Sequence, residues 1–214
     1  MSGKKYSYIL HKNDLPNDLT LGSVVAIDTE TMGLSHYRDR LCLVQVSDGN
    51  GVAHLVQIPP LAAGEGNGAR NAPNLAKLLA DSAKLKLFHF ARFDIAALYK
   101  HFGVVTRPVY CTKIASRLAR SFTDKHGLKD VCKDVLDIEI SKMQQSSDWG
   151  AVTLSDEQLR YAATDVYYLH DIKAKLDEIL VREARMALVQ ACCQFLPERA
   201  LLDLAGWEAD IFAH

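Results

Sequence analysis

The 214-residue sequence lacks any apolar run approaching the ~20 residues that a helix needs to cross a bilayer. Its first residues, 1–6, also lack the apolar core of a signal peptide. The five cysteines are an odd number, and they show neither a disulfide framework nor the paired C-x-x-C spacing of a zinc site. We therefore expect a cytoplasmic protein with reduced thiols and no membrane partner.

The sequence also lacks an excess of either charge, since 25 Lys and Arg face 26 Asp and Glu for a net charge of −1. Proteins that grip long nucleic acid non-specifically usually carry a large positive excess, so any nucleic-acid footprint here should be small or tightly focused. No internal repeat is visible. The length suits one domain with a sizeable core, together with a small helical appendage.

What is present is a β-branched, apolar run, residues 24–27, that ends in two carboxylates. Asp28 and Glu30 are two apart on a predicted strand, so both side chains point to one face. Gly33 then lets the backbone leave the sheet. No Lys or Arg lies in this strand, so a hard divalent cation would relieve the repulsion between the two anions. The short pattern is equally typical of two acids that cap a strand in water.

The remaining periodicity predicts alternating strands and helices. A strong hairpin signal at residues 48–51 predicts that the strands around it are antiparallel neighbours. Glycine-rich residues 64–70 indicate a mobile surface loop. A capping box at residues 155–158 opens what should be the longest helix, and Pro197 should break the helix that follows. The expected strands cover residues 6–10, 24–30, 40–47, 52–58 and 85–90, and the expected helices cover 74–80, 92–102, 112–120 and 128–136.

Further acids lie at the edges of these elements. Asp94 falls in the first turn of a helix, where it also suits the helix dipole. Tyr161 and Asp165 are four apart on the late helix, a spacing that also allows a simple local hydrogen bond. A basic stripe begins in the helix 112–120 and is either a solvated face or a phosphate contact. Its members are Lys113, Arg117, Arg120, Lys125, His126 and Lys129.

Together these residues form a recognisable pattern. Asp28-x-Glu30, Asp94 after the strand at 88–90, and Tyr161-x-x-x-Asp165 resemble the three exonuclease motifs of the DEDD superfamily, tyrosine subtype, which includes ribonuclease D. The segments 29–34, 122–130, 141–149 and 206–214 are similar to the nano-ribonuclease C family.

The resemblance implies an α/β fold of the ribonuclease H-like exonuclease type, with a mixed central sheet flanked by helices. It implies an exonuclease domain over residues 1–183. Residues 184–214 would be a helical C-terminal extension that packs on this domain or on a neighbouring subunit. Only about thirty residues follow the long helix, too few for the separate helical domain of longer relatives.

The implied function is a metal-dependent 3′-5′ exoribonuclease that cuts very short RNA, chiefly 5′-phosphorylated dinucleotides, to 5′-mononucleotides. Its partners would be short RNA and further copies of the chain, assembled as an octamer. One alternative is a broader ribonuclease D-like enzyme that trims the 3′ ends of longer RNA or DNA. Another is a non-catalytic binding protein on the same fold, because fold does not fix function.

The resemblance also implies roles for individual residues. Two divalent ions, Mg²⁺ or Mn²⁺, would be held by Asp28, Glu30, Asp94 and Asp165, with Asp28 as the bridging ligand. Tyr161 would orient the attacking water and help to deprotonate it. Leu34 would be a wedge between two bases, or alternatively a core leucine beyond the turn. His89 would contact substrate or be a structural residue. The full set of expected substrate-binding residues is Met32, Gly33, Leu34, His89, Lys125, His126 and Lys142.

Overall fold

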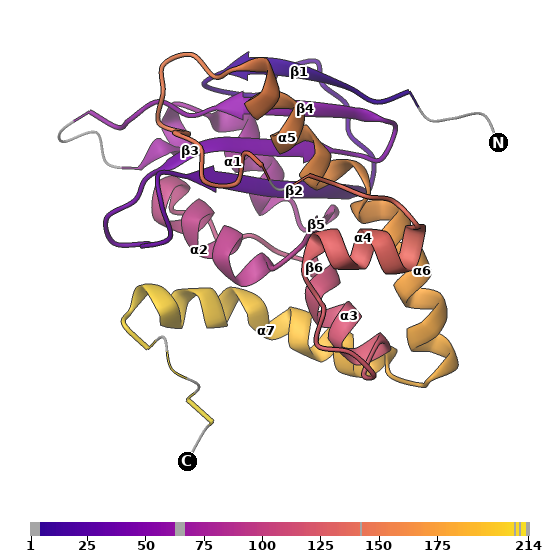
Figure 1. Ribbon diagram of the computed structural model, residues 1–214. Helices are drawn as coiled ribbons and strands as arrows, with labels where there is room; N and C mark the ends of the chain where they lie inside the picture. The colour runs from indigo at the N-terminus through magenta and orange to yellow at the C-terminus, as the bar shows by residue number, and fades with distance from the viewer. Residues whose placement is uncertain (1–4, 63–66, 142, 208, 210, 213–214) are drawn as a thin grey trace.

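A computed structural model of the chain describes residues 5–62, 67–141, 143–207, 209 and 211–212. Its centre is a sheet of six strands in the order β1-β4-β3-β2-β5-β6 (Figure 1). The strands are β1 (Ser7–Lys12), β2 (Val24–Thr31), β3 (Leu41–Ser47), β4 (Val52–Gln57), β5 (Leu85–Phe88) and β6 (Val109–Cys111).

The sheet is mixed, as predicted. Strands β2, β3 and β4 pair antiparallel, whereas β1 with β4, β2 with β5, and β5 with β6 pair parallel. In the β2–β3 pairing Asp28 lies opposite Gln45, and the register shifts between Glu30 and Thr31. Every residue of β3 is buried, because helices cover both faces of the sheet at its centre.

Helices surround the sheet and position its carboxylates. Helix α5 packs against β1 to β4, and α2 contacts β2, β3, β5 and β6. The last helix, α7, lies along α2 and also contacts α3 and β6 (Figure 1). The helices are α1 (Pro73–Ala80), α2 (Ala91–Phe102), α3 (Thr112–Ala119), α4 (Leu128–Leu136), α5 (Asp156–Tyr167), α6 (Leu169–Arg182) and α7 (Met186–Leu204), with a 3₁₀ turn η1 at Gly68–Arg70.

Two helix predictions are wrong. The capping box at Ser155 opens α5 as expected, but the helix divides at Tyr168, and the 19-residue α7 is the longest described helix instead. Pro197 does not break α7; it is buried within it. Packing of α7 along α2 holds the helix through the proline, so tertiary contacts override the local preference.

The prediction of a mobile loop at residues 64–70 is wrong for its last residues, Gly68–Arg70, which form the turn η1. Gly68 is buried at the start of η1, and a Cβ there would lie 2.1 Å from His101 Nε2. Residues 63–66 lie outside the described parts of the chain. This close approach of Gly68 to His101 joins residues 68–70 to α2, so these three residues are ordered.

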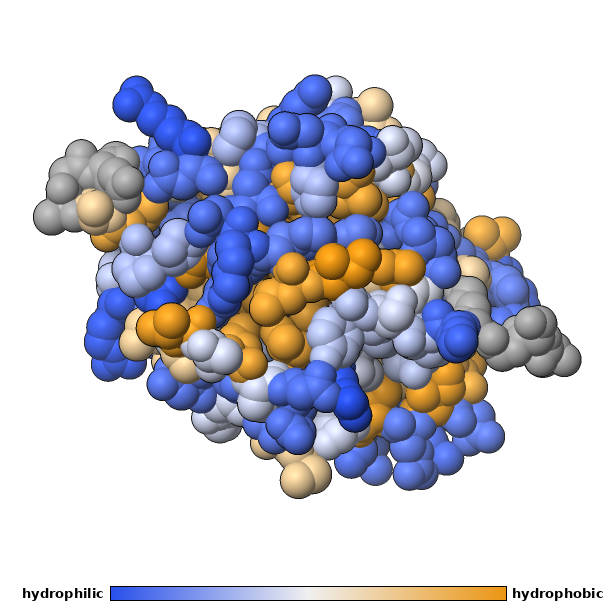
Figure 2. Space-filling view, turned by 90° about the horizontal axis from the view of Figure 1, so that it is seen from above, coloured by the Kyte–Doolittle hydropathy of each residue, from blue (hydrophilic) through white to orange (hydrophobic). Residues whose placement is uncertain are grey.

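One face of the molecule is largely polar. Figure 2 shows hydrophilic side chains over most of one face, with apolar side chains gathered in a band across its middle. In the described parts of the chain, every helix is too short or too polar to traverse a lipid bilayer.

Candidate metal-binding active site

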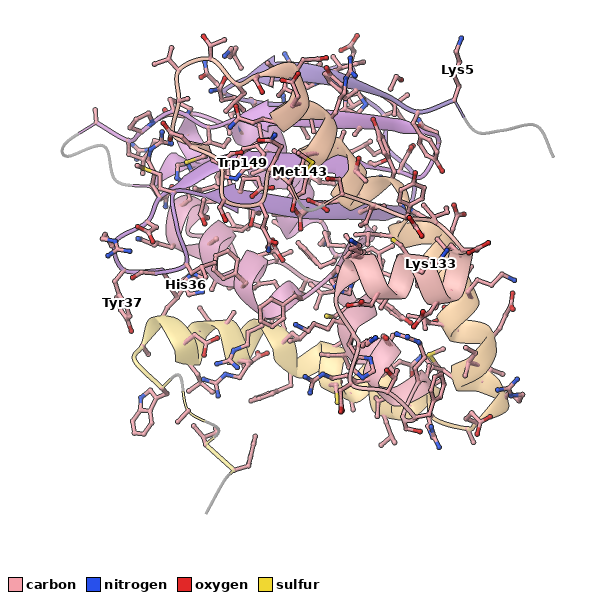
Figure 3. The ribbon with its side chains drawn as sticks, in the orientation of Figure 1. Lys5, His36, Tyr37, Lys133, Met143 and Trp149 are labelled. Atoms are coloured by element: carbon pink, nitrogen blue, oxygen red, sulfur yellow. The ribbon has the colours of Figure 1, made fainter. Side chains whose placement is uncertain are left out.

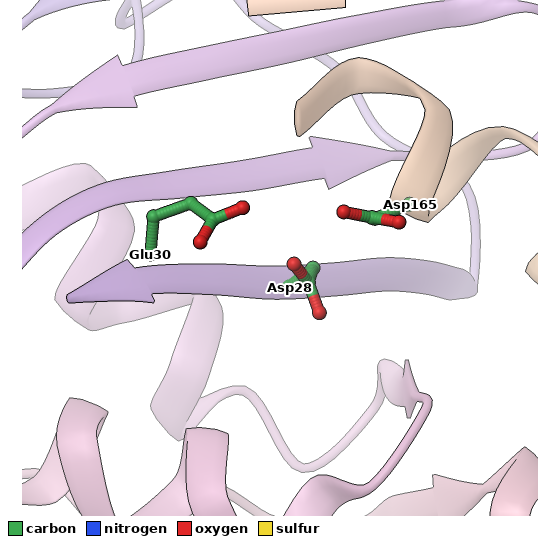
Figure 4. A group of neighbouring side chains, drawn as sticks. All are labelled: Asp28, Glu30 and Asp165. Atoms are coloured by element: carbon green, nitrogen blue, oxygen red, sulfur yellow. The ribbon is translucent and has the colours of Figure 1, made fainter. Parts of the chain in front are cut away.

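Three carboxylates converge between β2 and α5. Asp28 and Glu30 project from one face of β2, and Asp165 projects from α5, which packs against that face. One oxygen from each residue lies within 4.8 Å of the others. Figure 4 shows Glu30 and Asp165 pointing toward each other, with Asp28 between them. The predicted convergence of acids from distant parts of the sequence is therefore present at these three positions.

These carboxyl groups are electrostatically unsatisfied. Loss of hydration raises the pKa of Asp28 to about 7. Loss of hydration, and then the charges of the neighbouring acids, hold the pKa values of Glu30 and Asp165 well above their usual range. Among the described residues, no Lys, Arg or His forms an ion pair with any of the three. Hard oxygen donors that lack a protein cation fit a divalent metal ion such as Mg²⁺.

The fourth predicted acid, Asp94, lies beside this group. It is in the first turn of α2, as expected, and is only 4% exposed. Its Oδ1 accepts a hydrogen bond of 2.7 Å from Thr29 Oγ1. Its pKa is raised well above the usual range by burial first and by the charge of Asp28 second. Asp94 does not belong to the three-carboxylate group, but it lines the same cavity.

Tyr161, on α5, lines the same cavity as the three acids. Burial, followed by the charges of Asp165, Glu30 and Asp28, raises its pKa. The ring centroid lies 6.1 Å from that of Trp149, which is almost completely buried. A phenol in such negative surroundings stays protonated at neutral pH, so the geometry suits it to orient a water and opposes its use as a base.

A cavity of about 610 Å³ opens over the acids. Four of the predicted substrate-binding residues line it, namely Met32, Gly33, Leu34 and His89. Leu34 is 85% exposed, which excludes the alternative of a core leucine. A Cβ on Gly33 would lie 2.3 Å from Asp39 Oδ2, so only glycine fits this turn without rearrangement. His89 also has a structural contact, because its Nδ1 lies 2.8 Å from Thr112 Oγ1.

The other predicted substrate-binding residues are placed differently. His126 is 8% exposed, with Nδ1 2.9 Å from Ser116 Oγ. Lys125 is exposed, and neither residue lines the cavity. Lys142 lies outside the described residues. The cavity is instead lined by two other lysines of the basic stripe, Lys113 and Lys129.

The basic stripe is not a uniform solvated face. Arg120 is 2% exposed and pairs with Asp134, which contradicts the prediction for this residue. Its Nη1 donates to Ser116 Oγ and to the Lys125 carbonyl, both at 2.9 Å. Arg120 is therefore turned inward to hold the segment after α3, a role that helical spacing alone does not reveal.

Three residues near the site were not anticipated from the sequence. Gln45 is fully buried, and its Nε2 donates to Asp28 Oδ2 at 3.4 Å. An amide within an otherwise apolar strand was the available signal. Thr29 supports Asp94, as described above. Phe90 is 46% exposed at the cavity, has a positive φ of 71°, and lies 3.9 Å from Lys113 Nζ.

Comparison with known proteins identifies relatives of the whole chain and of most of it. A family described as 3′-5′ exonuclease matches residues 11–181. The structure of Brucella melitensis NrnC bound to pGG superimposes with a TM-score of 0.90 at 53% identity, covering 98% of this chain and 100% of that one. The same protein with bound Mg²⁺ gives a TM-score of 0.89 at 53% identity, over 97% and 99% of the two chains.

A curated relative is also similar at the sequence level. Ribonuclease D of Granulibacter bethesdensis is 33% identical over 165 residues, which is 77% of this chain and 40% of that protein. The chain thus spans less than half the length of this relative. The structural matches establish the ribonuclease H-like α/β exonuclease fold that the sequence predicted.

Proposed function

The chain belongs to the 3′-5′ exonuclease family, and from that premise we propose that it hydrolyses very short RNA to 5′-mononucleotides, chiefly 5′-phosphorylated dinucleotides. The observation that carries the proposal is the group of three half-buried carboxylates, Asp28, Glu30 and Asp165, which lines a cavity of about 610 Å³. The similarity to an NrnC structure bound to pGG supports the dinucleotide as substrate.

In this proposal Asp28, Glu30 and Asp165 would hold one divalent ion, and Asp94 with Asp28 would hold a second. Mg²⁺ and Mn²⁺ both suit such oxygen donors, and an NrnC structure with bound Mg²⁺ supports the former. When bound, the two ions neutralise charge on the phosphodiester and lower the pKa of the attacking water. The high pKa values of the carboxyl groups fit this role, because a cation restores their ionised forms.

The protein side chains supply positioning. The protonated hydroxyl of Tyr161 orients the attacking water by a hydrogen bond. Leu34, exposed at the cavity edge, separates the two bases of the substrate, and the loop at Met32 and Gly33 receives the terminal ribose. Lys113 and Lys129 on the cavity wall place positive charge near the substrate phosphates. Lys125, His126 and Lys142 stay predictions as contacts for the 5′ phosphate.

We also propose that further copies of the chain are its partners, with an octamer as the assembly that the resemblance implies. The C-terminal region, residues 184–214, presents exposed apolar side chains that suit contact with a neighbouring subunit. They are Leu188, Phe195, Trp207, Ile211 and Phe212. The five unbridged thiols support a reducing compartment, the cytoplasm, as the place of action.

The experiment compares hydrolysis of 5′-phosphorylated diguanylate with that of a 5′-phosphorylated seven-nucleotide RNA, both with Mg²⁺ or Mn²⁺ and with a chelator. We expect the dinucleotide to be cleaved at least ten times faster and neither to be cleaved with the chelator. Equal or faster loss of the seven-mer, as a ladder from the 3′ end, would instead support a ribonuclease D-like trimming enzyme.

A further inference from the structure

Asp203, near the end of α7, is bound into the elements that carry the acidic site. This helix lies beyond residues 11–181, the part of the chain shared with the exonuclease family. Asp203 is only 5% exposed. Its Oδ2 and Oδ1 accept hydrogen bonds from Arg92 Nε and Nη2, each of 2.6 Å, and Oδ1 accepts another from Arg199 Nη2 at 2.8 Å. A forked arginine–carboxylate pair of this kind fixes orientation as well as distance.

Asp203 has two sets of contacts, which we call the Arg92 arm and the Tyr37 arm. The Arg92 arm is the ion pair with Arg92, a residue close in sequence to the proposed metal ligand Asp94. Arg92 lies in the first turn of α2, two residues before Asp94. Phe93, between them, lines the cavity. The first turn of α2 begins at Phe90 without a side-chain cap, so the turn lacks the usual local support. The ion pair between Arg92 and Asp203 supplies a tertiary anchor for the turn that presents Asp94.

The Tyr37 arm is a contact with the loop between β2 and β3, the loop that carries Met32, Gly33 and Leu34. Tyr37 Oη donates to the backbone carbonyl of Asp203 at 3.2 Å. The Tyr37 carbonyl accepts from Lys100 Nζ of α2 at 3.1 Å. Figure 3 shows His36 and Tyr37 on this loop, with Tyr37 extended toward the C-terminal end of α7.

The loop is also joined to α2 directly. The ring centroids of His36 and Phe93 lie 4.7 Å apart. The loop, the first turn of α2 and the end of α7 thus form one connected unit around Asp203. Both segments that meet at this unit line the cavity, one at Leu34 and the other at Asp94.

We propose that Asp203 is a positioning residue, which together with Arg92 and Tyr37 clamps the last helix onto the turn that presents Asp94 and onto the loop that presents Leu34. The inference rests on the proposed function, since it assigns the C-terminal helix a part in that site. Its two arms have separate consequences. The Arg92 arm sets the position of a metal-binding acid, whereas the Tyr37 arm sets the loop that contacts the substrate.

The test uses the full-length protein and three substitutions, Tyr37→Phe, Arg92→Met and Arg92→Lys. Glu198→Gln is the matched control, because Glu198 lies on the same helix and pairs with Arg107 at the surface, where both side chains are nearly half exposed. For each variant we would measure kcat and KM on 5′-phosphorylated diguanylate. The Mg²⁺ concentration at half-maximal thermal stabilisation is measured without substrate.

We expect Tyr37→Phe to raise KM at least threefold with kcat within twofold of wild type. Arg92→Met should raise the Mg²⁺ midpoint at least threefold and lower kcat/KM about tenfold, and Arg92→Lys should recover part of both because it keeps the charge. Glu198→Gln should leave all three quantities within twofold of wild type.

The proposed positioning role of Asp203 is overturned if Tyr37→Phe and both Arg92 variants lower the melting temperature but leave KM and the Mg²⁺ concentration at half-maximal stabilisation unchanged. Should Arg92→Met fail to fold, Arg92→Lys and Tyr37→Phe decide the matter by the same criteria. A wild-type protein that binds Mg²⁺ but does not cleave the dinucleotide contradicts the proposed function, and the Mg²⁺ midpoints of the Arg92 variants still decide the clamp.

Discussion

Two carboxylate sites in this protein, the acids between β2 and α5 and the single residue Asp203 on α7, differ in the cations that face them. Burial alone would raise the pKa of Asp203, but hydrogen bonds and charge from Arg92 and Arg199 outweigh it and hold that pKa below its usual range. At the other site, loss of hydration raises the pKa of Asp28 to about 7, with no described Lys or Arg paired to it. The carboxylate of Asp203 is neutralised within the chain, whereas that of Asp28 has no such partner among the described residues and fits a cation from outside.

The presence or absence of a paired Lys or Arg distinguishes a structural acid from a candidate metal ligand. This criterion uses the chain's own geometry and needs no comparison with related proteins. An unpaired charge withdrawn from water is strongly unfavourable, so a fold keeps one only where a ligand compensates for it. The three carboxylates between β2 and α5 meet that condition. We therefore expect these carboxylates to lower the stability of the metal-free protein and Asp203 to raise it.

The largest expected effect tests the catalytic side of this comparison. Asp28→Asn should lower hydrolysis of the dinucleotide by about 10³-fold or more, because it removes a carboxylate charge from the proposed metal site. Asp165→Asn should have a similar effect. Initial rates at saturating Mg²⁺ would be measured, with Glu198→Gln as the control. Activity of Asp28→Asn within tenfold of wild type would contradict the assignment.

The next prediction sets the two sites against each other in stability. With a chelator at pH 8, Asp28→Asn should raise the free energy of unfolding by about 1–4 kcal/mol, because it removes an unpaired charge. Asp203→Asn should lower it by about 3 kcal/mol, because Arg92 and Arg199 lose their partner. Urea denaturation gives both values. The same sign for both variants would remove the distinction.

The pH dependence of stability sharpens the comparison. The pKa of Asp28 rises from an unfolded value near 3.8 to about 7 in the folded protein, so the folded state binds more protons between these values. The contribution of Asp28 to the stability of the metal-free protein should therefore fall as the pH rises from about 4 to 7 and stay constant above that range. Thermal melts with a chelator would measure this fall, and Asp28→Asn should make it shallower. An equal slope in the two proteins would refute the assignment.

A smaller effect is expected at Gln45. Its amide hydrogen bond to Asp28 is long, at 3.4 Å, so Gln45→Leu should lower kcat about threefold through a less ordered carboxylate. KM for the dinucleotide should stay within twofold, because Gln45 does not line the cavity. Steady-state kinetics of wild type and variant would measure both constants. An unchanged kcat would show that Asp28 needs no support from β3.

The sequence was sufficient for those features that local rules determine. The apolar run before Asp28 predicted β2, and the capping box at Ser155 predicted the start of α5. The common face of Asp28 and Glu30 followed from their spacing on one strand. The convergence of Asp165 with them followed from the family resemblance, since local periodicity does not bring separate elements together.

The remainder depends on tertiary contacts that periodicity does not encode. Arg120 has the spacing of an exposed residue but turns inward to Asp134, and Pro197 continues α7 because the helix is packed on α2. Asp203 is one of many charged residues in the C-terminal part of the sequence. Only the fold brings it to Arg92 and Tyr37, more than a hundred positions earlier.

The most direct test of the central claim is calorimetric titration of the metal-free protein with Mn²⁺, for wild type and Asp28→Asn at the same pH. The account predicts saturable binding by the wild type and affinity at least tenfold weaker in Asp28→Asn. Equal binding by the two proteins would contradict the claim that the acids between β2 and α5 hold the metal.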